Sequence, residues 1–529
     1  MKLFKNTFLS ATLTGLLLAA SWPTYGFPLL IFIAFIPLLM AEQNIRVSGT
    51  QKKLRVWANA YWAFLIWNLI TTWWLINADL FGMLFANLVN TLLMSLLFLL
   101  YHSIAKRVNQ ILSLIFLITL WICFEKLHLI WDFSWPWLNL GNVFSDYPQW
   151  VQWYEFTGTF GGTLWIWIAN AFGFYALVQN LSRKTAQFIL IISIPLVLSL
   201  WMYTTYHSTG KTKEVIVLQP NVDPYKEKYA IPNLEVARGL LQQTDSLITP
   251  NTEYILAPET VLAQNLPFGN FEYSEVRSLL RDYIYLHPKA QFLWGIDSYD
   301  LVYDSKEVTP SSNFVRDNLW VNNYNAALFI NRNPAYQKYL KSKLVVGIEN
   351  LPYKPILEPL IGNLMIDLGG TISTKTTQKE RSVFTGDDGT KVAPVICYES
   401  VYGEYVTGYV KNNAQFLAII TNDAWWSDTQ GHKQHLSLAQ LRAIETRRDI
   451  ARSANTGISA FINQKGDIIS RTQYNEKTAL RGLVHLNDVK TFYVRFGDYI
   501  AYAALPVMIV LFLFGITRRK KSPSYYWPR

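Results

Sequence analysis

The chain has 529 residues, of which 51% are hydrophobic, 15% aromatic and only 16% charged. A soluble domain usually has about 25% charged residues, so the composition argues against an entirely soluble protein and indicates membrane segments joined to a soluble part. The net charge of +10 does not predict nucleic-acid binding, because the basic residues lie in short clusters between apolar stretches. With only two cysteines, Cys123 and Cys397, a disulfide framework is excluded.

Eight apolar stretches predict a polytopic helical membrane bundle of eight spans. A helix needs about 20 mostly apolar residues to cross the hydrocarbon core. The first stretch also has the basic start and small-residue end of a signal peptide, but the spans that follow it favour a retained helix. The stretches cover residues 6–22, 27–42, 56–78, 80–103, 111–130, 157–180, 186–206 and 499–517.

Basic clusters follow every even-numbered span, whereas the loops at 21–26 and 77–81 contain no Lys or Arg. The positive-inside rule therefore predicts that both termini are cytoplasmic and that residues 207–498 lie on the far side of the membrane. The clusters are Arg46, Lys52, Lys53 and Arg55; Lys106 and Arg107; Arg183 and Lys184; and Arg518, Arg519, Lys520 and Lys521.

Two features of the membrane half have more than one interpretation. The loop at 131–155 contains five tryptophans, which suit an aromatic belt at the membrane interface or a surface that contacts acyl chains. Glu125 lies near the outer end of the fifth span, beside Lys126. An intramembrane carboxylate is a functional candidate by default, but near the interface it can also reach the headgroups or pair with the lysine.

Residues 211–490 have ordinary polarity and predict one α/β domain, which divides the chain at 1–210, 211–490 and 491–529. Short β-branched runs alternate with helical patterns, as layered α/β domains do. The predicted strands are Glu214–Leu218, Tyr254–Ala257, Gln291–Ile296, Asn325–Asn331, Val392–Cys397, Phe416–Thr421 and Ile458–Asn463, and the predicted helices are Asn233–Ile248, Glu272–Leu286 and His435–Ser453.

Three short segments of this domain carry reactive side chains at predicted strand ends. Glu259 follows the strand that ends at Ala257, and Lys341 is followed eight residues later by Glu349. Each alone is usually a solvated charge. Cys397 ends the run KVAPVIC, and the backbone N–H of the next residue, Tyr398, is a natural oxyanion donor.

A buried cysteine is most often an inert core residue, but the predicted location of Cys397 argues otherwise. Topology puts it in an oxidising compartment, and its only possible intrachain partner, Cys123, lies in a predicted span. An unpaired thiol there suggests reactivity. His432 and His435 have a metal-like spacing without a third ligand nearby, so a role at a helix start is the better interpretation.

Glu259, Lys341 and Cys397, in this order, resemble the triad of the nitrilase superfamily. The resemblance extends to the apolipoprotein N-acyltransferases, which join a nitrilase-like domain to eight spans. It implies an α-β-β-α sandwich for the soluble domain. Further similar segments are Leu218–Asn221, Tyr324–Asn325, Thr421–Trp425, Gln434–His435, Arg442–Glu445, Tyr493–Asp498, Ser21–Gly26 and Trp135–Gly141.

The resemblance implies transfer of an acyl chain from a phospholipid to the N-terminal α-amine of a diacylated apolipoprotein, through a thioester on Cys397. Glu259 would be the general base, and Lys341 with the Tyr398 N–H would stabilise the oxyanion. Glu349 and Glu399 would hold the lysine and the nucleophile in place. The family needs no metal or cofactor, and its location is the bacterial inner membrane with the catalytic domain periplasmic.

The chain departs from the family after the lysine, where Val346-Gly347-Ile348-Glu349 replaces the usual Pro-Phe-Gly-Glu. Lys343 is a competing lysine, but Lys341 has the Tyr-x-Lys spacing that the family requires. Two other functions remain open: a membrane-tethered amidase that uses water as acceptor, and a lipid- or lipoprotein-binding protein without catalysis.

Lipid contacts are expected at two places in the soluble domain. The first is the pair Trp425 and Trp426. The second is Gly347–Lys375, an apolar segment in which Leu360 and Ile361 are the candidate contacts. The segment is either a helix on the domain's own core or a lid that enters the outer leaflet.

Overall fold

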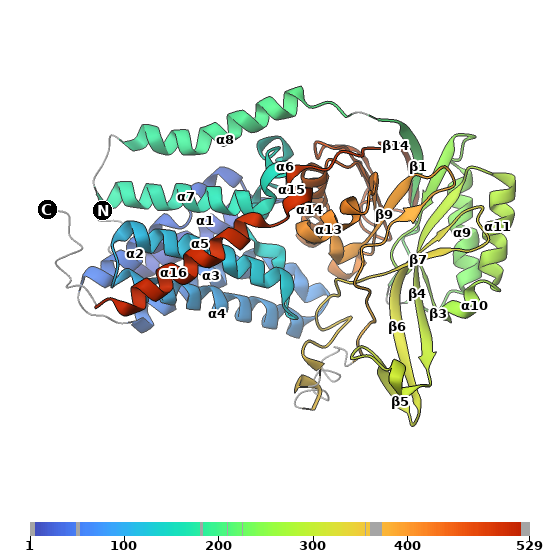
Figure 1. Cartoon of the computed structure of the whole chain (residues 1–529), viewed down its shortest axis with the longest axis horizontal. Coiled ribbons are helices and arrows are strands. Elements are labelled where there is room, and N and C mark those ends of the chain that lie inside the picture. Colours follow the sequence, from blue (N-terminus) through green and yellow to red (C-terminus); the bar gives the residue numbers. More distant parts are fainter. Residues whose placement is uncertain are drawn as a thin grey trace. The chain divides into compact units, whose positions relative to one another are not determined.

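The chain divides into a helical unit, Met1–Thr205 with Phe496–Arg529, and an α/β unit, Tyr206–Arg495 (Figure 1). The computed structural model describes residues 6–48, 53–179, 184–208, 210–224, 226–354, 356–359 and 373–519. The helical unit consists mainly of apolar helices, and the α/β unit of two sheets with helices on their outer faces.

The helical unit has six segments, among the residues described, that are long and apolar enough to cross a membrane. These are η2 with α2 (Pro28–Val47), α4 (Leu80–Ala105), α5 (Gln110–Ile130), α7 (Thr159–Val178), α8 (Thr185–Thr205) and α16 (Tyr499–Thr517). The unit is therefore a multi-pass membrane bundle.

The two other predicted spans form helices that do not meet these criteria. Helix α1 (Thr7–Ser21) has 15 residues and is about 22 Å long at 1.5 Å per residue, less than the core thickness of about 30 Å. Helix α3 (Lys53–Thr72) has 20 residues, but Asn59, Asn68 and several Trp and Tyr side chains lower its mean hydropathy.

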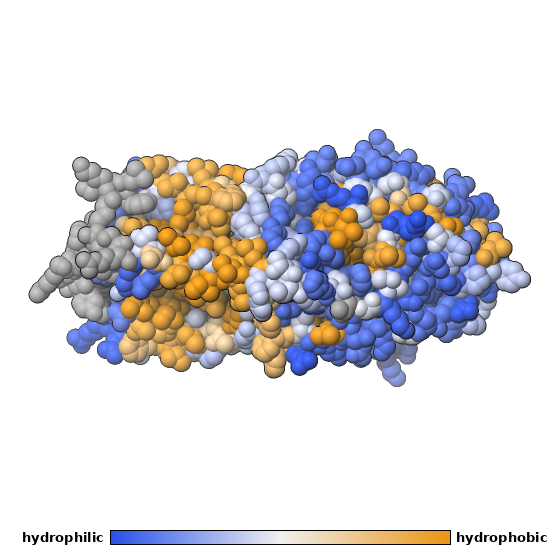
Figure 2. Space-filling view, turned by 90° about the horizontal axis from the view of Figure 1, so that it is seen from above, coloured by the Kyte–Doolittle hydropathy of each residue, from blue (hydrophilic) through white to orange (hydrophobic). Residues whose placement is uncertain are grey.

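The surface of the helical unit is apolar, as a bilayer requires. Figure 2 shows hydrophobic side chains covering most of this unit's visible face, whereas hydrophilic side chains dominate the α/β unit. On α16, Leu505, Val510 and Leu513 are exposed, although a water-soluble bundle would bury such side chains.

Glu125 on α5 faces the interior of the helical unit, so the interpretation as a partner of Lys126 is wrong. Its carboxylate accepts hydrogen bonds from Leu140 N at 2.7 Å, Thr163 Oγ1 at 2.7 Å and Trp121 Nε1 at 3.1 Å. Lys126 instead pairs with Asp498 at 2.8 Å. The three neutral donors replace the water that this carboxylate loses on burial.

Arg46, counted above as a loop cation, is buried at the end of α2. Its Nε lies 3.0 Å from Glu42 Oε1, and His102 Nδ1 contacts the same oxygen at 2.6 Å. In the Trp-rich loop, Trp137 and Trp153 are buried against Trp74 and Trp165 rather than at the surface.

The remaining described elements of the helical unit are short turns and half-turns. They are η3 (Trp73–Asn77), η4 (Pro136–Leu138), η5 (Leu140–Phe144), η6 (Pro148–Trp150) and α6 (Tyr154–Thr157).

The first sheet of the α/β unit has the order β14-β1-β2-β4-β6-β5, with β3 pairing with β4 and β7 with β6. The segments of its central strands that are covered on both faces are apolar, as Ile255–Leu256, Phe292–Ile296 and Ala326–Ile330 show. The bounds are β1 (Thr212–Gln219), β2 (Thr252–Leu256), β3 (Leu262–Pro267), β4 (Gln291–Val302), β5 (Asn313–Arg316), β6 (Leu319–Ile330), β7 (Gln337–Leu340) and β14 (Thr478–His485).

The second sheet has the order β13-β12-β11-β10-β9-β8, and β9, β10 and β11 run parallel. The sheets face each other, as the Tyr254–Phe416 ring contact at 5.3 Å indicates. The bounds are β8 (Phe384–Thr385), β9 (Lys391–Ile396), β10 (Phe416–Thr421), β11 (Ile450–Ala454), β12 (Ala460–Ile462) and β13 (Ile468–Arg471).

Helices cover the outer faces of both sheets and make the α-β-β-α sandwich that was predicted (Figure 1). Helices α9 (Asn233–Asp245) and α11 (Glu275–Leu286) cover the first sheet, and α13 (Gly403–Lys411) and α14 (Gln430–Thr446) the second. Shorter elements are α10 (Phe268–Phe271), η8 (Ser305–Glu307), η9 (Cys397–Val401), η10 (Ala424–Trp426) and α15 (Phe492–Phe496).

The predicted helix His435–Ser453 is wrong at its end. Helix α14 ends at Thr446, Arg447 takes a left-handed backbone with φ +50°, and Ile450–Ala454 is the buried strand β11. The apolar spacing continued across this boundary, but a fully buried strand gives no alternation that distinguishes it from a buried helix.

Candidate active site

Glu259 lies in a tight connection between β2 and β3, and β4 holds this connection through its backbone. Gly295 N donates to Pro258 O at 3.2 Å. A Cβ at Gly295 would lie 2.4 Å from Pro258 O and 2.7 Å from Glu259 Cα. Only glycine allows the strand to come this close, so Gly295 fixes where the Glu259 carboxylate points.

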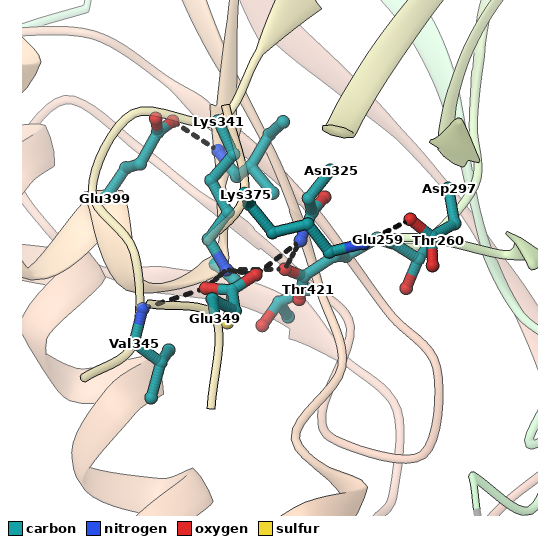
Figure 3. Close-up of polar contacts among 12 residues, drawn as sticks. Glu259, Thr260, Asp297, Asn325, Lys341, Val345, Glu349, Lys375, Glu399 and Thr421 are labelled. Carbon is teal, nitrogen blue, oxygen red and sulfur yellow. Dashed lines mark hydrogen bonds and ion pairs between the residues drawn. The ribbon is translucent and has the colours of Figure 1, made fainter. Parts of the chain in front are cut away.

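Lys341 directly follows β7, and its ammonium bridges two carboxylates (Figure 3). Its Nζ lies 2.8 Å from Glu259 Oε1 and 2.8 Å from Glu349 Oε2. Val345 N also donates to Glu349 Oε2 at 2.8 Å and so holds this carboxylate in place. Glu349 therefore contacts Lys341 even though the residues between the two depart from the family's pattern.

Asn325 on β6 connects the same groups from the neighbouring strand. Its Nδ2 donates to Glu259 Oε1 at 2.7 Å and to Glu349 Oε1 at 2.8 Å. Its carbonyl accepts from Lys341 N at 2.8 Å. One asparagine thus sets both the spacing of the two carboxylates and the position of the lysine backbone.

The ion pairs of Lys341 with Glu259 and Glu349 determine the protonation states of these side chains. Burial alone lowers the pKa of Lys341, but the carboxylates of Glu259 and Glu349 raise it well above its ordinary value. Burial alone raises the pKa of Glu259, but the charge of Lys341 and its hydrogen bond hold it below its ordinary value. At neutral pH, Glu259 is ionised and Lys341 is positively charged.

Cys397 lies at the turn between β9 and the helical turn η9. Its φ of +47° is the left-handed conformation, which a side-chain-bearing residue adopts only where the surroundings enforce it. The residue is 7% exposed. Burial and then the charge of Glu259 raise the pKa of its thiol, while Lys341 and a hydrogen bond with Thr421 lower it by less. At rest Cys397 is therefore a neutral thiol. It lies close enough to Glu259 and Lys341 for their charges to shift its pKa.

Glu399 joins the lysine segment to the cysteine segment. Its Oε1 accepts from Ser342 N at 2.7 Å, the residue after the lysine, and its Oε2 accepts from Ile396 N at 2.9 Å, the residue before the cysteine. The remaining donors are the hydroxyls of Tyr339, Tyr405 and Tyr409. One buried carboxylate thus fixes the distance between two strand ends on different sheets.

A second buried network holds the carbonyl of Cys397. Ser400 Oγ donates to this oxygen at 2.7 Å, and His435 Nε2 lies 3.2 Å from it. His435 Nδ1 contacts Asp423 Oδ1 at 3.0 Å, and Arg452 donates to the other oxygen of Asp423 at 2.7 Å. The His435 imidazole and the Asp423–Arg452 ion pair therefore support the strained turn at Cys397.

Two family models match the chain in succession. The model described as apolipoprotein N-acyltransferase N-terminal domain matches residues 14–172, and the model of carbon-nitrogen hydrolases matches residues 308–493. The apolipoprotein N-acyltransferase of Chlorobaculum tepidum is 27% identical over 98% of both chains. That of Geobacter metallireducens is 24% identical over 97% of this chain and 96% of its own.

The chain belongs to the apolipoprotein N-acyltransferase family. It has both parts of that family, in the family's order, and matches its relatives over almost the whole length. Among solved structures, the NitN amidase from Neterenkonia sp. AN1 aligns with 55% of this chain and 99% of its own at 12% identity and a TM-score of 0.37. A likeness this distant adds no argument about function.

Tyr398 and the competing lysine, Lys343, both lie near the ring of Tyr402. Tyr398 is buried with its ring against Tyr402 at 5.2 Å. The Lys343 ammonium lies 4.6 Å from the Tyr402 ring centre, whereas the ion pair with Glu259 belongs to Lys341. Sequence spacing therefore selected the lysine that bridges the carboxylates.

Trp425 and Trp426 lie in η10 and are both half-buried. The Trp426 ring meets the His435 ring edge-on at 5.5 Å. In the apolar segment, Leu351 is buried, whereas Ile348 and Ile356 are 51% and 62% exposed. Leu360 and Ile361 lie outside the residues that the structure describes, so the choice between lid and core helix remains a prediction.

Sequence reasoning assigned no role to several residues that the site brings together. Asn325 and Thr421 were noted only as parts of similar segments. The pair of Asp297 and Lys375, at 2.5 Å, was missed. Each of these depends on a contact between distant strands, and no local pattern reports such a contact.

Proposed function

We propose that the chain transfers an acyl chain from a phospholipid to the N-terminal α-amine of a diacylglyceryl-modified apolipoprotein, through a thioester on Cys397. The observation that carries this proposal is the Lys341 ammonium between Glu259 and Glu349, next to a thiol held in a strained turn. A base, an oxyanion stabiliser and a nucleophile are the three groups that acyl transfer needs.

In the first half-reaction the sulfur of Cys397 attacks an ester carbonyl of the phospholipid. Glu259 takes the thiol proton as the S–C bond forms, and the Lys341 ammonium and the Tyr398 N–H stabilise the oxyanion. The C–O bond then breaks, and the departing lysophospholipid oxygen takes the proton from Glu259. Because burial raises the thiol pKa, an adjacent base is required for attack at neutral pH.

In the second half-reaction the α-amine attacks the thioester carbonyl. Glu259 accepts a proton from the amine and returns it to the cysteine sulfur as the S–C bond breaks. The acyl group leaves as an amide. Glu349 and Glu399 act as positioning residues, the first on Lys341 and the second on the backbone next to both Lys341 and Cys397. No step requires a metal or a cofactor.

The same proposal includes eight spans, with α1 and α3 crossing alongside the six apolar segments, both termini cytoplasmic and the α/β unit periplasmic in a bacterial inner membrane. Its support is the position of the basic clusters. A periplasm-active reporter should work when fused at residue 310 and fail at residue 50 or at Arg529. Activity at residue 50 would contradict the topology.

The test of function is a transfer assay with purified protein, a phospholipid and a diacylated lipopeptide. We expect an amide-linked third acyl chain on the peptide and lysophospholipid as co-product. Release of free fatty acid without modified peptide would identify a membrane-tethered amidase instead. Binding of lipid without either product would identify a non-catalytic binding protein.

A further inference from the structure

A third lysine of the site, Lys228, has no assigned role. It lies in the connection between β1 and α9 and is 8% exposed. Its Nζ donates to the hydroxyl of Thr260, the residue after Glu259, whose backbone has a φ of +44°. The side chain therefore reaches from a surface connection into the cluster that contains Glu259.

Lys228 differs from the other two lysines in its partners. Lys341 contacts Glu259 and Glu349, and Lys375 contacts Asp297 at 2.5 Å. Among the described residues, no carboxylate oxygen lies within ion-pair distance of Lys228 Nζ. An ammonium has three N–H donors, and the Thr260 hydroxyl takes one.

The charged groups around Lys228 lie on or next to strands of the first sheet. Burial lowers the pKa of its ammonium, the charges of Glu259 and Asp297 raise it, and those of Lys341 and Lys375 lower it. Lys341 and its two carboxylates sum to one negative charge, and Lys375 with Asp297 sums to zero. The charge of Lys228 therefore balances the net charge of the Lys341 cluster, but Lys228 is the one cation of the three whose ammonium makes no direct contact with a carboxylate oxygen.

Two aromatic rings lie near this cation. The ammonium lies 5.7 Å from the Tyr229 ring centre and 6.0 Å from that of Trp425. Tyr229 is 58% exposed, and Trp425 is half-buried. A cation between amphipathic rings at a partly open edge suits a ligand with an anionic group next to apolar chains.

We propose that Lys228 binds the phosphodiester of the acyl donor, while Glu259 and Lys341 act on the donor's ester. The proposal rests on the function proposed above and names the group by which that site recognises its donor. Lysine is a frequent phosphate ligand because its point charge accepts many geometries. In a phospholipid only a few bonds of glycerol separate phosphate from ester, so a phosphate ligand must lie next to the acylation groups, as Lys228 does.

The test compares two acyl donors in single-turnover acylation of Cys397 on the full-length protein in detergent. One donor is a phospholipid, and the other is a p-nitrophenyl ester, which has no phosphate. We expect Lys228→Met to raise the half-saturating phospholipid concentration roughly 10- to 100-fold, the loss of one charge-assisted contact. The half-saturating concentration of the p-nitrophenyl ester should stay within about twofold of the wild-type value, since that ester never used the contact.

Lys226→Met is the matched control, because Lys226 is an exposed lysine two positions away. It removes the same charge without touching the site and should leave both donors unaffected. Lys228→Arg should recover most of the phospholipid affinity. Equal losses of both donors in Lys228→Met would show that the lysine only positions Glu259 through Thr260, and no loss with either donor would exclude any contact with phosphate.

If Lys228→Met does not fold, a competition measurement on the wild-type protein tests whether the site binds the phosphate of the donor. Glycerol 3-phosphate should compete with the phospholipid but not with the p-nitrophenyl ester. Competition against both donors, or against neither, would overturn the assignment. Failure of the function proposed above is distinguishable, because the wild-type protein would then form no thioester with phospholipid or would lose that thioester to water without acylating a lipopeptide.

Discussion

Replacing Gly295 with alanine tests whether the close approach of β4 sets the position of Glu259. The new Cβ would lie 2.4 Å from both Pro258 O and Thr260 N, and ordinary contact begins at 3.4 Å. All of the nearest atoms are backbone, so the connection that carries Glu259 must move by about 1 Å. Misplacement of this size lowers a catalysed rate by about 100-fold, and overpacking destabilises a protein by about 1–3 kcal/mol.

The assay is single-turnover thioester formation on Cys397, with unfolding followed on the same preparation. Gly239→Ala is the control, because no atom lies within 4 Å of a Cβ there and alanine is favoured over glycine inside helix α9 by about 1 kcal/mol. It should keep the wild-type rate and equal or exceed the wild-type stability. A Gly295→Ala protein that acylates within threefold of wild type would refute the reasoning, since Glu259 would then not need this backbone position.

Other predictions follow from the charges and hydrogen bonds of the site. Lys341→Met should stop thioester formation, whereas Lys343→Met should have little effect; the reverse ranking in a single-turnover assay would mean that the oxyanion ligand is misassigned. Glu399→Gln should leave one buried backbone N–H without an acceptor and lower the free energy of unfolding by about 1–3 kcal/mol, measured by denaturant titration; an unchanged midpoint would contradict the network. Because the pKa of the Cys397 thiol lies above its ordinary value of 9.0, its alkylation in a Cys123→Ala background should still accelerate as the pH rises through 9, and a plateau near pH 7 would contradict a buried thiol.

Strand ends are the part of the site that sequence alone could predict. Glu259 and Cys397 each follow an apolar run, and a polar side chain after a buried strand lies at that strand's end. Lys341 follows the mixed run Gln337–Leu340 and is predicted only from its Tyr-x-Lys spacing. The bridging role of Asn325 needs the pairing of Ala326 with Leu340, which joins β6 to β7. The register between two strands depends on tertiary packing, and the sequence of neither strand alone predicts it.

Buried polar groups were the part that sequence could not predict. The sequence leaves Glu125 open between a functional carboxylate and one that reaches the headgroups or pairs with Lys126, whereas its hydrogen-bond donors come from α5 itself, the following loop and α7. Glu399 collects three tyrosine hydroxyls from β7 and α13. Most of these partners lie on other elements, and even Trp121, four residues before Glu125 on the same helix, is not marked as a partner by composition or periodicity.

The measurement that tests the central claim most directly is the mass of the Cys397 peptide after the protein is incubated with phospholipid alone. The account predicts an added acyl chain on this peptide that hydroxylamine removes, as it removes a thioester. The adduct should be absent in Cys397→Ala, which should remain folded. An acyl chain on any other residue, or transfer to a lipopeptide by the Cys397→Ala protein, would contradict the account.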